Sequence, residues 1–197
     1  LGARGAAEAL LRSEGYYQPV LEDVVEGEET PVAIVQVTPG PRFALTDPIV
    51  NWVDPPPALS LREAAVADIR LKAGDPGRPV DDTAPEGRIV AGLTRRGHAD
   101  ARPEPRRVVV DHAALSVQPT YNINAGPLVR LDGVRLETRG PTNPDWVAGL
   151  APWTAGEVYD PEDVAELERR LLETGVYDGV GVALAPPAQT LPDGNRP

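Results

Sequence analysis

The 197-residue sequence contains no cysteine and no methionine. Without cysteine the chain can form no disulfide, thiolate metal site or thiol nucleophile, and it suits a reducing or an oxidising compartment equally. No apolar run approaches the roughly 20 residues that a membrane-spanning helix needs, and no signal segment opens the sequence. The missing methionine indicates a processed or excised piece, so we expect targeting or anchoring segments to lie outside these residues.

Positive charge is also scarce. The chain carries 19 basic and 30 acidic residues, which gives a formal net charge of −11. Such a chain is repelled by phosphate backbones and by anionic membrane surfaces. We therefore expect polypeptide partners and no nucleic acid.

Catalytic and metal-binding patterns are weak. The two histidines, His98 and His112, lack the spacing of a helical metal site, and Ser60 looks like a helix cap instead of a nucleophile. The acidic pairs at 28–29 and 81–82 lack the spacing of a calcium-binding loop. The sequence therefore predicts a protein that is not an enzyme and that needs no cofactor or metal.

The chain contains 19 glycines and 23 prolines, and these separate segments in which apolar residues recur at regular spacing. The first block, residues 1–41, predicts a helix that ends at Gly15. Two β-branched runs at 16–25 and 32–37 then predict a hairpin around the acidic turn at 26–30. This block is therefore predicted to form one helix followed by two strands.

The second block predicts the order strand, helix, helix, strand, strand. Ser60 with Glu63, and Thr83 with Glu86, form capping-box patterns that start the two helices. The first helix carries an apolar stripe of Leu61, Ala65, Ile69 and Ala73. The expected elements are a strand at 43–53, helices ending at Gly74 and Gly97, and strands at 106–111 and 114–123.

The third block shows the same order up to its fourth element. It predicts a strand at 128–137, a short helix within 143–153, a longer helix from Asp160 to Gly175, and a strand within 177–187. We expect Trp146 and Trp153 to pack within this block or against the second. The partner strand that should come next is missing from the sequence.

An internal repeat of about 80 residues connects the three blocks. The glycines at 15, 97 and 175 align, each four residues after a leucine, and the Gly-Pro stretch at 40–50 aligns with the one at 126–136. These two marks predict an α+β protein made of tandem β-α-α-β-β modules. Residues 1–41 would be the C-terminal part of a first module, 42–127 a complete second, and 128–197 a third that lacks its last strand.

Several short motifs resemble one known family. They are "GYY" at 15–17, "GVY" at 175–177, the junctions "VTPGP" and "INAGP", the strand "LDGVRLETRG", and the helix and following turn at 155–180. Together they resemble the POTRA domains of the BamA/TamA outer-membrane assembly superfamily, and most of all its TamA branch of autotransporter assembly factors. The second block departs from the pattern, because "GHA" at 97–99 replaces the aromatic pair that follows the glycine.

The resemblance implies a periplasmic location in a Gram-negative outer-membrane protein, and three-stranded sheets with two helices on one face. It implies that the region binds partner proteins and unfolded β-strand clients by edge-strand addition. The implied partners are a TamB-like inner-membrane protein, unfolded outer-membrane proteins or autotransporters, and the chain's own C-terminal barrel. A purely structural periplasmic spacer, with no client binding, is the alternative.

The resemblance also nominates the second strand of the complete module as the binding edge. Pro103 and Pro105 lack N–H groups and limit pairing in its first half. The residues left free to pair are Arg106, Arg107, Val108, Val109 and Val110. A basic cluster nearby could dock an acidic partner or lipid headgroups, and it comprises Arg95, Arg96 and Arg102. An ordinary structural strand and a solvated rim are the alternatives for these two sets.

Overall fold

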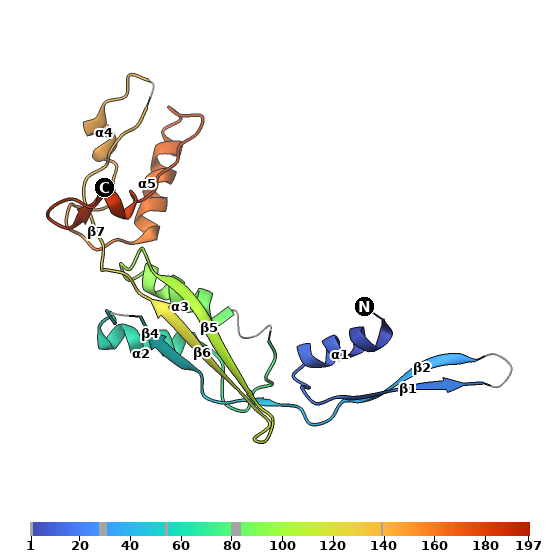
Figure 1. Cartoon of the computed structure of the whole chain (residues 1–197). Helices are drawn as coiled ribbons and strands as arrows, with labels where there is room; N and C mark the ends of the chain where they lie inside the picture. The colour runs from blue at the N-terminus through green and yellow to red at the C-terminus, as the bar shows by residue number, and fades with distance from the viewer. Residues whose placement is uncertain (1, 28–30, 54, 80–83, 139) are drawn as a thin grey trace.

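The computed structural model describes the chain except for residues 1, 28–30, 54, 80–83 and 139. Three units follow one another in space as they do in the sequence, with the N-terminal hairpin at one end and α4 and α5 at the other (Figure 1). Within the described ranges, no helix combines the length and the hydropathy needed to cross a membrane.

The first unit consists of helix α1 and a β-hairpin. Strands β1 and β2 pair antiparallel from Val20 with Thr38 to Glu26 with Val32. Leu21 is the only buried residue of the two strands, and α1 contains none. The elements are α1 (Ala3–Ser13), β1 (Val20–Glu26) and β2 (Val32–Thr38). The predicted helix and hairpin are confirmed, although part of the predicted turn lies outside the described residues.

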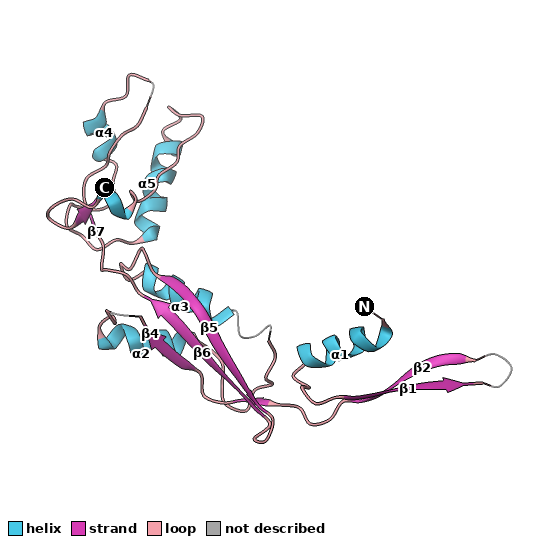
Figure 2. Ribbon diagram, in the orientation of Figure 1, coloured by secondary structure: helices cyan, strands magenta, loops and turns pink. Residues whose placement is uncertain are grey.

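The second unit is a mixed sheet with its two helices on one face (Figure 2). Strand β6 is central, because β3 and β4 pair parallel with one side of it and β5 pairs antiparallel with the other. The elements are β3 (Ala44–Leu45), β4 (Ile49–Trp52), α2 (Leu59–Asp68), α3 (Ala84–Thr94), β5 (Arg102–Asp111) and β6 (Ser116–Asn124). The predicted element order is confirmed, except that the first strand is split into β3 and β4, with Pro48 between them.

The core of the second unit lies between β6 and the helices. Every second residue of β6 is buried, as expected for a strand with one covered face. Tyr121 and Ile123 of β6 pack with Ile89 and Leu93 of α3 and with Ile69 after α2. A second cluster joins Phe43, Leu45 and Val117 at the other end of the sheet.

The predicted bounds of α2 were wrong at both ends. The helix starts directly after the extended residue Ala58 and has no side-chain cap, so Ser60 lies inside the helix. It ends at Asp68, because Arg88 from α3 donates hydrogen bonds to the carbonyls of Asp68 and Ile69. Arg70 then adopts a left-handed conformation with φ of 57°. The capping residue predicted for α3, at position 83, lies outside the described residues.

The third unit packs α4 and α5 around Val147, Leu167 and Leu171. Asp160 caps α5 by accepting a hydrogen bond from the Glu162 N–H, and Gly175 follows the helix in a left-handed conformation. The elements are β7 (Arg130–Leu131), α4 (Pro144–Ala148), α5 (Pro161–Glu173), the 3-10 turn η1 (Pro187–Gln189) and β8 (Asn195–Arg196).

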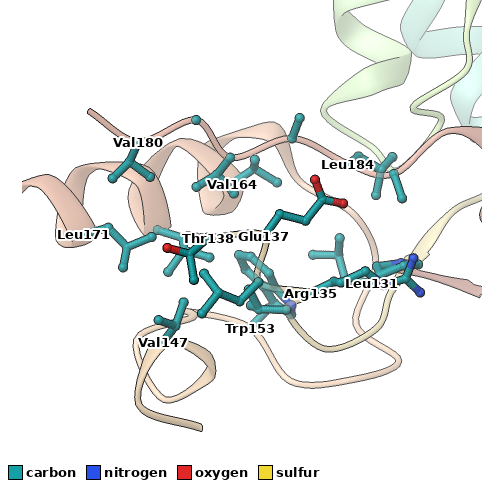
Figure 3. Close-up of a pocket in the computed structure, with 18 of the residues that line it drawn as sticks. Leu131, Arg135, Glu137, Thr138, Val147, Trp153, Val164, Leu171, Val180 and Leu184 are labelled. Carbon is teal, nitrogen blue, oxygen red and sulfur yellow. The ribbon is translucent and has the colours of Figure 1, made fainter. Parts of the chain in front are cut away.

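Two strand predictions in the third unit were wrong. Only two residues of the 128–137 segment form a strand, and the 177–187 segment forms no regular strand. Both segments line a cavity of about 450 Å³ (Figure 3). Among the described residues, no strand lies beside the rest of either segment to pair with its backbone groups. Instead β7 pairs parallel with β8, a strand that the sequence pattern did not indicate.

The two tryptophans of the third unit differ. Trp153 packs against the core cluster and donates its indole N–H to the Asp132 carbonyl at 2.9 Å, as expected. Trp146 is 42% exposed and is not part of that core cluster, so it packs only partly within its own unit. It lies on α4 beside Val176 and Tyr177, at a shallow hollow in the surface.

Candidate partner-binding edge

Strand β5 lies at the edge of the second unit's sheet. Within the described chain its only strand partner is β6, so its other side is open. This is the strand that the family resemblance nominated as a binding edge. An open edge presents backbone donors and acceptors to which another strand can add.

The register of β6 shows which β5 groups face the open side. The carbonyls of Val117 and Ile123 accept from the N–H groups of Thr46 and Val53, so these β6 residues direct their backbone groups away from β5. Val117 lies opposite Val110. Since backbone direction alternates along a strand, the N–H and C=O groups of Val108 and Val110 face the open side. Those of Val109 face β6.

The first half of β5 is irregular. The register shifts between Glu104 and Arg107, and the Asn122 side-chain amide donates to the Pro105 carbonyl at the bulge. Pro103, opposite Ile123, would direct its N toward the open side, but it has no hydrogen to donate. Within the predicted stretch 106–110, Val108 and Val110 are therefore the residues whose N–H groups face the open side.

The side chains of this stretch are apolar and basic. Val108 and Val109 are 38% and 40% exposed, whereas Val110 packs against the cluster around Phe43. Arg106 forms an ion pair with Glu86 at the start of α3, with 3.3 Å between Nη1 and Oε2. Arg107 is exposed. The open edge therefore presents the backbone groups of Val108 and Val110. Beside them lie two arginines, one paired with Glu86 and one exposed.

Comparison with known proteins identifies the fold. No protein-family model and no curated protein matches the chain. The chain is similar to the crystal structure of Haemophilus influenzae BamA POTRA3-5, with a TM-score of 0.58 and 18% identity over 98% of this chain and 75% of that one. The chain has the tandem POTRA fold. It is also similar to Haemophilus ducreyi BamA lacking POTRA domains 1-3, with a TM-score of 0.59 and 18% identity over 78% of this chain and 28% of that one.

The three predicted basic docking residues are not equally available. Arg96 donates to the Gly92 carbonyl at 2.7 Å and lies 3.9 Å from Asp68. Arg102 is paired with Glu104 at 3.2 Å. Arg95 is exposed at the end of α3. Two of these three arginines thus already have acidic neighbours in the same POTRA unit.

Both histidines serve junctions between POTRA units. His98 is buried, and its Nδ1 lies 3.0 Å from the Gly126 carbonyl. His112 lies 3.0 Å from the Gln18 side-chain amide and packs edge-on against Phe43. In the ranges that the structure describes, no group of three or more acidic or histidine residues could hold a metal ion.

The two junctions are built in the same way. At the first, the Phe43 N–H donates to the Gly15 carbonyl at 2.9 Å; at the second, the Val129 N–H donates to the Gly97 carbonyl at 2.8 Å. Both glycines are buried, with φ of 90° and 92°. The Tyr17 hydroxyl strengthens the first junction by donating to the Gly77 carbonyl at 2.8 Å. The glycine motif repeated in the sequence therefore marks the place where one POTRA unit docks on the next.

An ion pair that sequence reasoning missed closes the second junction. Arg196 of β8 donates two hydrogen bonds to Asp100, at 2.9 and 2.7 Å. The Arg196 side chain is only 4% exposed. These hydrogen bonds lower the pKa of the Asp100 carboxyl and raise the pKa of the Arg196 guanidinium. No local pattern in the polar C-terminal segment indicates this contact between residues 96 positions apart.

Proposed function

We propose that the chain is the periplasmic POTRA region of a Gram-negative outer-membrane protein assembly factor, TamA-like within the BamA superfamily. The observation that carries the proposal is the open edge of β5, where Val108 and Val110 direct their backbone groups outward. The region acts as a binding scaffold and not as an enzyme. Its clients are unfolded outer-membrane proteins or autotransporters, which add an extended strand to this edge.

Edge-strand addition suits such clients for a physical reason. Hydrogen bonds to the backbone of 106–110 are tolerant of sequence, so one edge can receive many different strands. Arg107, with no ion pair among the described residues, favours acidic residues on the incoming strand. The other partners we propose are a TamB-like inner-membrane protein at the first unit and the chain's own C-terminal barrel. Arg95 would serve a second, basic docking surface with Arg96 and Arg102.

We keep the module boundaries at 1–41, 42–127 and 128–197. Strand pairing supports the choice of 1–41 as only part of a module. In the described chain β2 pairs only with β1, whereas β6, the equivalent strand of the second unit, has a strand on each side. The third range begins two residues before β7, directly after the linker that carries Gly126. Its final strand is represented only by β8.

A proline scan of the edge tests the proposal. Val108→Pro removes an N–H that faces the open side, so the variant should fold and should no longer bind. The probe is an unstructured peptide copied from an outer-membrane β-strand, titrated into the 197-residue chain and followed by NMR. Unchanged protein should show saturable shifts along 106–110, and Val108→Pro should lose them.

The matched control lies one residue away. Val109→Pro removes an N–H that faces β6, so it should lower the free energy of unfolding by about 2 kcal/mol, through a broken ladder bond and an unpaired carbonyl. If Val108→Pro destabilises the chain as much as Val109→Pro does, the assigned direction of the edge groups is wrong. If the Val108→Pro variant folds and still binds, client addition at this edge is excluded.

The structural spacer is the second candidate. The repeated glycine junctions and the Asp100–Arg196 pair favour it, because a spacer needs fixed angles between its units. The same titration separates the two functions. Absence of any shift in the unchanged protein at millimolar peptide would favour the spacer.

A further inference from the structure

Strand β5 contains one residue more than the part of β6 with which it pairs. The pairs on either side of the register shift are Glu104 with Asn122 and Arg107 with Thr120. The extra residue forms a β-bulge at positions 105–106. Because a bulge reverses the alternation of a strand, the backbone groups beyond it face the opposite way from those of a regular ladder.

The bulge decides which residues the open edge presents. Gln118 of β6 directs its backbone groups toward β5, because its neighbour Val117 directs them away. With the bulge, Gln118 lies opposite Val109, so Val108 and Val110 face the open side. In a regular ladder continued from the first half of β5, Gln118 would lie opposite Val108. Val109 would then face the open side.

The residues of β5 are compatible with either register. In the regular ladder both prolines of the strand would direct their nitrogens to the open side, where no N–H is needed. Val109 would take the place of Val110 opposite Val117, and Arg107 would take the place of the partly exposed Val108. The long Arg107 side chain would extend past the edge into water. Contacts outside β5 must therefore separate the two registers.

Two side-chain contacts hold the bulge, one on each face of the sheet. On the uncovered face, the Asn122 amide donates to the Pro105 carbonyl at 2.6 Å, and its oxygen accepts from Asn51 of β4 at 2.9 Å. On the helix side, Arg106 pairs with Glu86 of α3, whose side chain is only 14% exposed. A regular ladder would turn the Pro105 carbonyl toward the open side and the Arg106 side chain away from the helices.

We propose that Asn122 and Arg106 are positioning residues that clamp the bulge and thereby select Val108 and Val110 as the residues to which a strand can add. Arg106 then acts through the register, and Arg107 is the arginine left to contact an acidic client. The consequence for clients rests on the proposed function. The register of β5 does not depend on it.

Hydrogen exchange of the 197-residue chain, followed by NMR, tests the clamp. In the double variant Asn122→Val with Arg106→Thr, we expect β5 to adopt the regular ladder. Exchange at the Val108 and Val110 amides should slow at least about tenfold, and exchange at Val109 should speed up at least about tenfold. A substitution that only loosens the sheet cannot slow amides that already face the open side.

The matched control is Thr120→Val, on the same strand and the same face as Asn122. It should leave exchange at Val108 unchanged. Asn122→Val alone keeps the contact between Arg106 and α3, so it should fold even where the double variant does not. It should slow Val108 exchange at least about threefold by populating the regular ladder. The clamp is overturned if Val108 exchange does not slow in Asn122→Val or in a folded double variant, or if Thr120→Val slows it equally.

A client titration forms a separate arm. In the double variant Val109→Pro should abolish binding of the client peptide, as Val108→Pro should in the otherwise unchanged protein. Continued binding in that triple variant would overturn the selection of client-binding residues by the clamp. Absence of binding to the unchanged protein would count against the proposed function alone, because the exchange test requires no client.

Discussion

Gly97→Ala should lower the free energy of unfolding by about 3 kcal/mol, whereas Gly175→Ala should lower it by only about 1 kcal/mol. Both glycines end a second helix and both have positive φ, 92° and 68°, so alanine is strained at either position. They differ in their surroundings. A Cβ on Gly97 would lie 2.4 Å from a Val158 methyl and 2.7 Å from a Leu128 methyl, whereas a Cβ on Gly175 would meet nothing within 4 Å.

Urea unfolding of the two variants measures this difference. Gly175→Ala reports the cost of the left-handed backbone alone, and the excess cost of Gly97→Ala reports the close packing at the junction between the second and third units. Gly15→Ala should fall between them, because its Cβ would lie 3.2 Å from the Gly77 carbonyl oxygen. Equal costs for Gly97→Ala and Gly175→Ala would show that the junction does not constrain Gly97 in solution.

Asp100→Asn should lower the free energy of unfolding by about 2 to 3 kcal/mol, because it leaves the buried Arg196 guanidinium without its counter-charge. The same variant should widen the range of angles between the second and third units, measured by small-angle X-ray scattering. Asp23→Asn is the control. It removes the partner of Arg4 in an ion pair whose side chains are 55% and 65% exposed, so stability should be unchanged within error.

The loss caused by Asp100→Asn should depend on pH. Hydrogen bonds from Arg196 lower the pKa of the Asp100 carboxyl, so its contribution to stability is complete above the unfolded aspartate pKa of about 3.9. The contribution disappears as the pH falls through the lowered pKa of the folded state. Unfolding curves of the two proteins should therefore differ at pH 7 and converge in acid. A constant difference down to pH 2 would rule out this ion pair as the cause.

Local chemistry in the sequence was sufficient for much of the fold. Glycine at 15, 97 and 175 ended helices because it adopts positive φ without a steric penalty. The β-branched runs predicted the hairpin, and Asp160 followed by Pro161 correctly marked the start of α5.

Contacts between residues far apart in the sequence decided the helix end and the strand directions that local patterns did not predict. The end of α2 is set by Arg88, a side chain from another helix. The outward direction of Val108 follows from which β6 carbonyls are already taken by β3 and the residue after β4. These facts depend on pairing register, and register is not encoded in the composition of any single strand.

The sequence by itself determined that this protein is a tandem of small α+β units joined after a repeated glycine, because helix endings and strand patterns depend on neighbouring residues. Only the tertiary structure decided how the units are joined and where a strand can add. The Asp100–Arg196 pair and the open direction of Val108 each require backbone or side-chain groups from segments far apart in the chain. Such groups meet only when both segments are folded, so the residues next to each of them in the sequence do not indicate the contact.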